Sequence, residues 1–195
     1  MKKINGCLWI LVTLFGCGPN ARGHEVVSEP DYTLANKRQP TGLAEGGEPT
    51  GRMNGIVAAH NRVRQRHCAP GLTWSDTAAK VAQKWATTLQ NNGCAFEHSQ
   101  TRNYGENLAF FSPASTGTVE SALGGWYGEV NQYDFGAPGF AAATGHFTQV
   151  VWVASKFIGC GVAECGGGIL WVCNYGPAGN VLGQFENNVK PTTCR

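Results

Sequence analysis

Apolar residues recur at helical spacing in three segments of the chain, and each segment predicts an amphipathic helix. The first helix is expected to end near residues 67–68. The second begins after Ser75, a residue type that suits an N-cap, and closes at Gly93, which we expect in the left-handed conformation common after helices. The apolar faces consist of Ile56, Ala59, His60 and Val63 in the first helix, and of Ala78, Val81, Ala82, Trp85, Ala86 and Leu89 in the second.

A third helix is predicted after Thr118, whose side chain can cap its N-terminus. Gly124 and Gly125 lie inside this helix and weaken it by about 2 kcal/mol relative to alanine, so packing must hold it in place. The residues expected to face inward are Val119, Ala122, Leu123, Trp126, Tyr127 and Val130.

Strand patterns are short and lie mainly near the C-terminus. Residues 159–164 and 169–175 predict two strands around a glycine-rich turn at residues 165–168, and residues 72–74 are expected to be extended. Helices followed by a strand hairpin indicate a mixed α/β domain, with helices packed on a small antiparallel sheet. Loop is expected over residues 94–107, 110–113 and 136–144.

The N-terminal segment has the features of an export signal. Lys2 and Lys3 precede an apolar run over residues 7–15, which is too short to span a bilayer. The run leads into Leu14-Phe15-Gly16-Cys17, which resembles a bacterial lipobox, so Cys17 is the expected lipidation site. Phe15 is unusual in that pattern, and ordinary signal cleavage a few residues later is the alternative. We therefore divide the chain into a lipoprotein signal peptide (1–16), a disordered tether rich in Pro, Gly and charge (17–52), and one domain (53–195).

The cysteine count agrees with export into an oxidising compartment. Of eight cysteines, Cys7 is lost with the signal peptide and Cys17 carries the lipid, which leaves six for three disulfides. Six cysteines allow fifteen pairings, and the sequence does not choose among them. Cys68–Cys94 is the preferred pair, since each residue follows a predicted helix. The other four cysteines, whose pairing stays open, are Cys160, Cys165, Cys173 and Cys194.

Charge excludes one class of partner. Without Lys2 and Lys3, the fifteen basic residues fall to thirteen and equal the thirteen acidic ones. The sequence contains no basic stripe of the kind that holds phosphates, so nucleic-acid binding is not expected. The membrane is expected to be reached only through the N-terminal lipid.

Four ordered motifs resemble those of the CAP superfamily, which comprises cysteine-rich secretory, antigen 5 and pathogenesis-related 1 proteins and is also called the SCP domain. The resemblance covers roughly residues 53–191 and implies an α-β-α sandwich. The motifs are His60-Asn61-Arg62-Val63-Arg64, Gly105-Glu106-Asn107-Leu108, Gly145-His146-Phe147-Thr148-Gln149-Val150-Val151-Trp152 and Cys173-Asn174-Tyr175-Gly176-Pro177-Ala178-Gly179-Asn180.

The resemblance implies a cleft that holds two histidines and two carboxylates: His98, Glu106, Glu129 and His146. His98 and His146 are the candidate ligands of Zn²⁺ or another divalent metal, and the carboxylates can add ligands or orient a bound water. Catalytic zinc usually has three protein ligands, so a weak or hydrated site is expected. Glu106 could equally bond backbone amides in its loop. The other polar motif residues are expected to be structural: His60, Asn61, Arg64, Asn174, Tyr175 and Asn180.

Three functions remain open at this stage. The first is an exported, membrane-tethered binding module for a sterol, a lipid or a cell-envelope component. The second is a metal-assisted hydrolase of peptides or cell-wall material, and the third is a secreted effector recognised by a protein partner. A serine hydrolase is disfavoured, because Ser99, Thr148 and Ser155 lack the nucleophile-elbow motif.

Overall fold

A four-stranded sheet forms the centre of the part that the computed structural model describes, residues 46–47, 49–101 and 103–194. Strands β3 (Phe157–Cys165) and β4 (Gly168–Gly176) form an antiparallel hairpin. β2 (Gly105–Phe111) pairs antiparallel with β4 and β1 (Thr73–Trp74) pairs parallel with β3, which gives the order β1-β3-β4-β2. The predicted hairpin is confirmed. Gly166 and Gly167 form its turn, and both have the positive φ that a tight hairpin turn demands.

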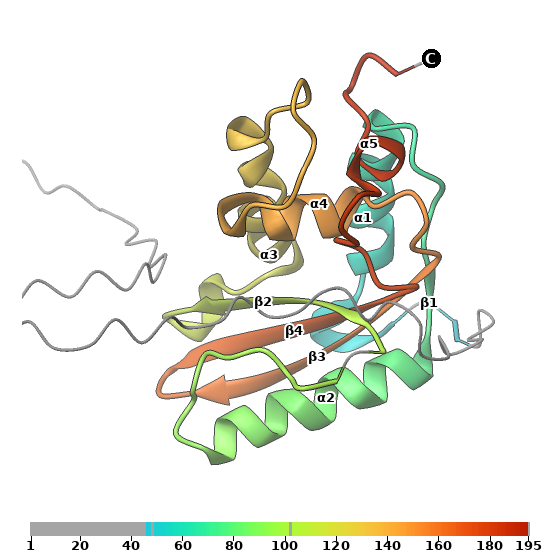
Figure 1. Ribbon diagram of the computed structural model, residues 1–195. Coiled ribbons are helices and arrows are strands. Elements are labelled where there is room, and N and C mark those ends of the chain that lie inside the picture. Colours follow the sequence, from blue (N-terminus) through green and yellow to red (C-terminus); the bar gives the residue numbers. More distant parts are fainter. Residues whose placement is uncertain (1–45, 48, 102, 195) are drawn as a thin grey trace, which may run out of the picture. The chain divides into compact units, whose positions relative to one another are not determined.

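Helices cover both faces of this sheet, as Figure 1 shows. On one face lies α2 (Asp76–Asn91); on the other lie α1 (Ile56–Arg66), α3 (Val119–Gly128), α4 (Gly145–Val151) and the short α5 (Phe185–Asn188). The expected α-β-α sandwich is therefore confirmed. α2 approaches β3 closely, because a Cβ at Gly159 or Gly161 would collide with its backbone.

The predicted helix boundaries hold, because local capping sets them. The side chain of Ser75 accepts a hydrogen bond from the backbone N–H of Ala78, and Gly93 closes α2 with φ of 72°. Thr118 and Ser121 form a capping box at the start of α3. Short 3-10 turns complete the element list: η1 (Gly51–Met53), η2 (Ala114–Thr116), η3 (Glu129–Gln132) and η4 (Ala142–Thr144).

Three expectations from the sequence need correction. Residues 105–107 and 110–111 were expected to be loop, but they belong to β2, which is stabilised by its pairing along β4. The predicted loop over residues 136–144 ends in the turn η4. Structured chain also begins before the predicted boundary at residue 53, since Pro49 is buried and η1 starts at Gly51. The predicted signal peptide and the lipidation site Cys17 lie outside the described residues.

The six cysteines expected in disulfides all form them, but the preferred pair was wrong. Cys94 lies beyond the end of α2 and reaches Cys165 at the hairpin turn, on the same side of the sheet. Cys68 follows α1 on the opposite side, so the sheet separates these two cysteines. The disulfides are Cys68–Cys194, Cys94–Cys165 and Cys160–Cys173, the last joining directly opposed residues of β3 and β4.

Arg64 joins α1 to the end of α4. Its guanidinium is fully buried. Its N–H groups donate to four backbone carbonyls, which take the place of the carboxylate that often accepts from arginine. Burial lowers its pKa to about 10. Arg64 therefore has the structural role that the sequence predicted for it. The accepting carbonyls are those of Pro70, Val150, Trp152 and Ser155.

The outer edge of β3 is closed by a side chain. β1 pairs only with Phe157 and Ile158, so the following part of that edge has no strand beside it within the described chain. The amide of Gln83, on α2, takes the place of a strand at Val162. Its Nε2 donates to the Val162 carbonyl at 2.9 Å, and its Oε1 accepts from the Val162 N–H at 3.1 Å.

Candidate functional site

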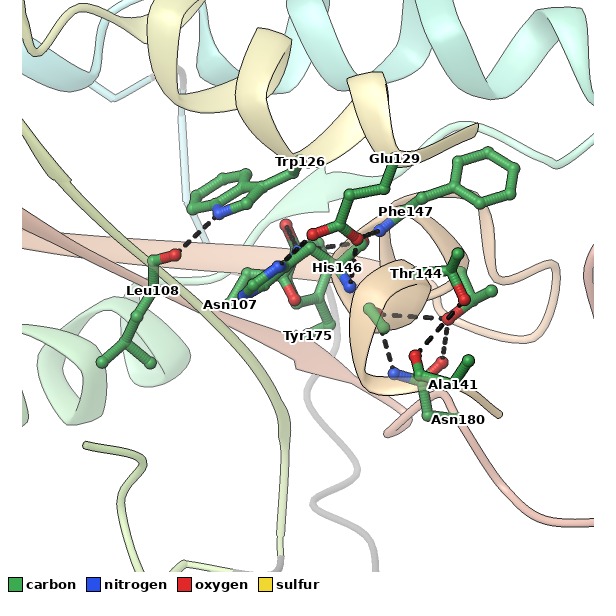
Figure 2. A network of polar contacts seen from close by, with 12 residues as sticks. Asn107, Leu108, Trp126, Glu129, Ala141, Thr144, His146, Phe147, Tyr175 and Asn180 are labelled. Carbon is green, nitrogen blue, oxygen red and sulfur yellow. Dashed lines mark hydrogen bonds and ion pairs between the residues drawn. The ribbon is translucent and has the colours of Figure 1, made fainter. Parts of the chain in front are cut away.

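The first histidine–carboxylate pair joins η3, which directly follows α3, to α4 (Figure 2). His146 is the second residue of α4, and its Nδ1 lies 2.6 Å from Oε1 of Glu129. The other oxygen of Glu129 accepts the backbone N–H groups of His146 and Phe147 at 2.9 and 3.0 Å. One carboxylate therefore orients the imidazole and also binds the first turn of the helix that carries it.

Glu129 replaces a local cap for α4. Thr144, the residue at the N-cap position, makes no capping hydrogen bond with its side chain. A carboxylate at a helix N-terminus satisfies N–H groups that lack intrahelical partners and interacts favourably with the helix dipole. Glu129 reaches this position because α3 ends at Gly128 and the chain continues in η3.

The second pair lies between a loop and the edge strand. His98 precedes β2, and its Nδ1 lies 2.9 Å from Oε1 of Glu106, the second residue of that strand. The same oxygen accepts the backbone N–H of Ser99 at 2.9 Å. The carboxylate of Glu106 is nearly buried, with 7% of its side chain exposed, whereas His98 is 61% exposed. Glu106 thus binds a backbone amide, which is the structural role expected from the sequence, and also a histidine.

The carboxylates determine which imidazole nitrogen is available. An ionised carboxylate only accepts hydrogen bonds, so Nδ1 of each histidine must carry the proton. The lone pair of each neutral ring is then on Nε2, for which neither ring has a protein partner among the described residues. A carboxylate that holds one ring nitrogen while the other faces outward is the arrangement found behind metal-binding histidines.

A buried polar network supports His146 from behind. Asn107 donates to the carbonyl of His146 at 3.2 Å and to the hydroxyl of Tyr175 at 3.3 Å, as Figure 2 shows. The Tyr175 hydroxyl also lies 2.9 Å from Nε2 of His60, whose Nδ1 lies 2.8 Å from the carbonyl of Ile56. Because a carbonyl can only accept, Nδ1 of His60 donates and its Nε2 accepts from Tyr175.

Burial fixes the charge of this network. Desolvation lowers the pKa of His60 to about 4 and raises the pKa of Tyr175, so both side chains are neutral at physiological pH. The structural roles expected for these two residues agree with this geometry. Asn107 was not singled out from the sequence, although it stands next to Glu106 in the second motif.

The two histidine–carboxylate pairs lie on opposite faces of the edge strand β2, near its start. Glu106 and Asn107 are consecutive in β2, and successive side chains point to opposite faces of a sheet. Glu106 holds His98 on one side, while Asn107 binds the backbone of His146 on the other. Gly105, just before them, packs against the side chain of Gln149 on α4. The four predicted site residues therefore form two pairs near the start of β2.

The donor set limits the kind of metal site. Within residues 46–47, 49–101 and 103–194, no group of three or more His, Cys, Asp or Glu side chains is arranged to hold an ion. Both carboxylates are engaged with imidazole and backbone N–H groups. A closed four-ligand site does not fit this set, and the groups left for a metal are Nε2 of His98 and Nε2 of His146, with water completing its shell.

The hydroxyl groups named as possible nucleophiles have other roles. Thr148 donates to Asn180, and Ser155 donates to the carbonyl of Pro177. The hydroxyl of Ser99 makes no hydrogen bond within the described residues. No serine or threonine hydroxyl is bonded to His98 or His146 in that part of the chain, so its geometry does not support a serine hydrolase.

Comparison with known proteins gives a consistent result. The model of the cysteine-rich secretory protein family, CAP, matches residues 57–175. Protein PRY2 of Saccharomyces cerevisiae is 45% identical over 139 residues, which cover 70% of this chain but only 40% of that protein. The human Golgi-associated plant pathogenesis-related protein 1 is 38% identical over 144 residues, 71% of this chain and 92% of that protein.

Solved structures show the same fold. The crystal structure of NaASP2 with Zn²⁺ aligns with a TM-score of 0.60 at 25% identity, over 74% of this chain and 90% of that one.

Proposed function

The chain belongs to the CAP, or cysteine-rich secretory protein, family, and from that premise we propose that it is an exported ligand-binding module rather than an enzyme. Members of this family are largely secreted proteins, which agrees with the leader and the three disulfides. The ligand, the metal and the lipid anchor described below are parts of the proposal.

One observation carries the proposal: each histidine has a carboxylate on Nδ1 and an Nε2 that no described protein group uses. Nε2 of His98 and of His146 would hold Zn²⁺ or another divalent ion. A bound ion would supply a Lewis-acid centre that attracts an anionic or carbonyl oxygen of a ligand. The ligand class that the family suggests is a sterol, a lipid or a component of the cell envelope.

The positions of the carboxylates favour binding over hydrolysis. A general base needs a free oxygen within hydrogen-bond reach of the water that it activates. Both oxygens of Glu129 are engaged, and Oε1 of Glu106 has two donors while its Oε2 is buried. Neither carboxylate is thus poised toward a water on the Nε2 side of its histidine.

Zinc titration of the purified protein tests the metal part of the proposal. We expect saturable binding, and at least a tenfold loss of affinity in His98→Ala and in His146→Ala, because each removes one of two protein ligands. Glu97→Ala, which changes an exposed carboxylate beside His98, is the control and should bind zinc like the wild type. Absence of saturable binding by the wild-type protein would overturn the metal site.

Ligand titration separates the module from the alternatives. Saturable binding of sterols or fatty acids that survives chelation would support the module. A chelator-sensitive hydrolysis of peptide or cell-wall material, lost in His146→Ala, would support the metal-assisted hydrolase instead. Binding of a protein partner that is indifferent to both histidine variants would support the effector.

The membrane tether needs a separate test. None of the helices among the described residues is long and apolar enough to cross a bilayer. We propose that lipid on Cys17 anchors the chain in the cell envelope, with residues 17–52 as spacer. Radiolabelled palmitate should be incorporated by the wild type and not by Cys17→Ser; a wild type without label would overturn the anchor.

A further inference from the structure

Four buried polar atoms next to the His98–Glu106 pair have no hydrogen-bond partner in the part of the chain that the structure describes. They are Oγ of Ser99, Oε2 of Glu106 and both amide atoms of Asn174. Asn174 is completely buried. Buried polar atoms are nearly always satisfied in folded proteins, so a group of four such atoms requires an explanation.

The three residues are neighbours. Asn174 on β4 is the register partner of Glu106 on β2. Directly opposed residues of an antiparallel pair project to the same face, with Cβ atoms about 4.5–5.5 Å apart. Ser99 is held at the same carboxylate through its backbone N–H. Asn174 is also the partner of Gly159, which packs against α2, so this face of the sheet is the one that α2 covers.

The four atoms form a complementary set. The amide Nδ2 of Asn174 is a donor and Oε2 of Glu106 is an acceptor; the amide Oδ1 is an acceptor and the hydroxyl of Ser99 can donate to it. None of them bonds another directly, and a bound water with two donor and two acceptor positions would satisfy the group. An asparagine meets this need because one side chain presents both a donor and an acceptor.

We propose that Asn174 is a positioning residue for His98, acting through Glu106. Its amide donates to Oε2 of Glu106 through a bound water, since no direct hydrogen bond joins the two groups, and thereby fixes the plane of the carboxylate. Oε1 then faces Nδ1 of His98 and keeps the ring in the tautomer whose Nε2 is free. The Ser99 hydroxyl is the second donor of this group and bonds the same water. Asn174, which the sequence marked as structural, thereby acts on the candidate site.

The importance of this inference for function rests on the proposed function. Its first test, the tautomer of His98, does not depend on that function. The ring tautomer of His98 can be measured by nitrogen NMR at one mildly alkaline pH, without metal or ligand. In the wild type we expect the signature of a protonated Nδ1 and an unprotonated Nε2. In Asn174→Ala, and in Asn174→Leu, which retains most of the volume, we expect the mixed tautomers of an exposed histidine.

Two further variants make the result interpretable. Asn188→Ala removes a buried amide at α5, far along the chain from His98, and should leave the tautomer unchanged. Ser99→Ala removes the hydroxyl donor but keeps the backbone N–H bond to Glu106; it should shift the tautomer in the same direction by a smaller amount. If neither Asn174 variant folds, the result for Ser99→Ala decides, and an unchanged tautomer there overturns the proposal.

Zinc affinity distinguishes this proposal from the proposed function. We expect a 10- to 100-fold weaker affinity in Asn174→Ala, the usual effect of changing a group behind a ligand. A tautomer shift in a protein whose wild type binds no zinc would retain the positioning role and reject the metal. A folded Asn174→Ala or Asn174→Leu with the wild-type tautomer would overturn the positioning role, whatever the zinc result.

Discussion

The two histidine–carboxylate pairs use the same local chemistry on different supports. In both, a carboxylate holds Nδ1 of the histidine and also accepts a backbone N–H beside it. The pair at His146 lies between two helices and is backed by a buried network through Asn107. The pair at His98 hangs from a loop at the edge strand, and its imidazole is twice as exposed, at 61% against 30%.

This difference indicates a division of roles. His146 is fixed by the fold, because the bonds that orient it also hold α4 in place. His98 depends on one carboxylate and a loop, so its position is less constrained. In the proposed site, one rigid and one adaptable imidazole would accept ions or ligands of more than one size. The following changes test whether the two halves differ in this way.

Replacing the two carboxylates should give the largest contrast. Glu129→Ala removes the acceptor of three donors, two of them at the start of α4, and we expect it to lower the free energy of unfolding by about 4 kcal/mol. Glu106→Ala removes the acceptor of two donors, and we expect a loss of about 2 kcal/mol. Urea denaturation measures both; equal losses would contradict the proposed difference.

Acid should weaken the supporting network behind His146. The pKa of His60 is about 4 in the folded protein and 6.5 in the unfolded chain, so the unfolded chain binds the proton more tightly. The contribution of His60 to the free energy of unfolding is therefore fully present above pH 6.5. It falls as the pH is lowered toward 4, by about 3 kcal/mol in total. His67, whose pKa is also lowered by burial, acts in the same direction.

Hydrogen exchange locates this effect. As the pH falls from 6.5 toward 4, the backbone amide of Phe147 should lose protection relative to the global stability of the protein. The reason is that the buried network supports α4. His60→Gln, which cannot take up the proton, should flatten the dependence of the unfolding free energy on pH. An undiminished slope in this variant would exclude His60 as the cause.

Removing the imidazoles themselves should have the smallest effects on stability. His98→Ala leaves the Ser99 N–H on the Glu106 carboxylate, so we expect a change of less than about 0.5 kcal/mol. His146→Ala leaves Oε1 of Glu129 without its hydrogen-bond donor, the Nδ1–H of the imidazole, and we expect a loss of about 1–2 kcal/mol. Thermal unfolding of both variants, compared with the wild type, measures the contrast. A larger loss for His98→Ala would reverse the assignment of rigid and adaptable halves.

Local signals in the sequence predicted most of the helices and the hairpin correctly. Ser75 and Thr118 begin their helices through side chains within the same segment, and Gly93 ends α2 through its own backbone freedom. The turn between β3 and β4 needs only two adjacent glycines. Such features depend on neighbours within a few residues, so the sequence alone was sufficient.

The missed elements depend on residues far away in the chain. β2 begins with Gly105, Glu106 and Asn107, residue types that are poor in strands, and it exists because β4 supplies the hydrogen bonds. α4 is capped by Glu129, which lies in η3 well before it in the chain, so no cap was visible at its own N-terminus. Which cysteines can pair depends on the side of the sheet on which each one lies. The spacing of the cysteines along the chain does not encode this.

The candidate site shows the same limit. The family motifs pointed to the four histidine and glutamate residues, and the structure pairs each histidine with one carboxylate. Neither motif spacing nor helical periodicity indicated which carboxylate held which histidine. Asn107 and Asn174 were equally hard to assign, because their roles come from the registers of β2 and β4.

The amide of Gln83 has a consequence for how copies of this protein behave together. An open strand edge offers unpaired N–H and C=O groups on which another chain can build a sheet. By occupying both groups of Val162, one glutamine side chain denies a second molecule the place where it could add a strand. Loss of this side-chain amide in Gln83→Ala should appear as self-association that increases with protein concentration.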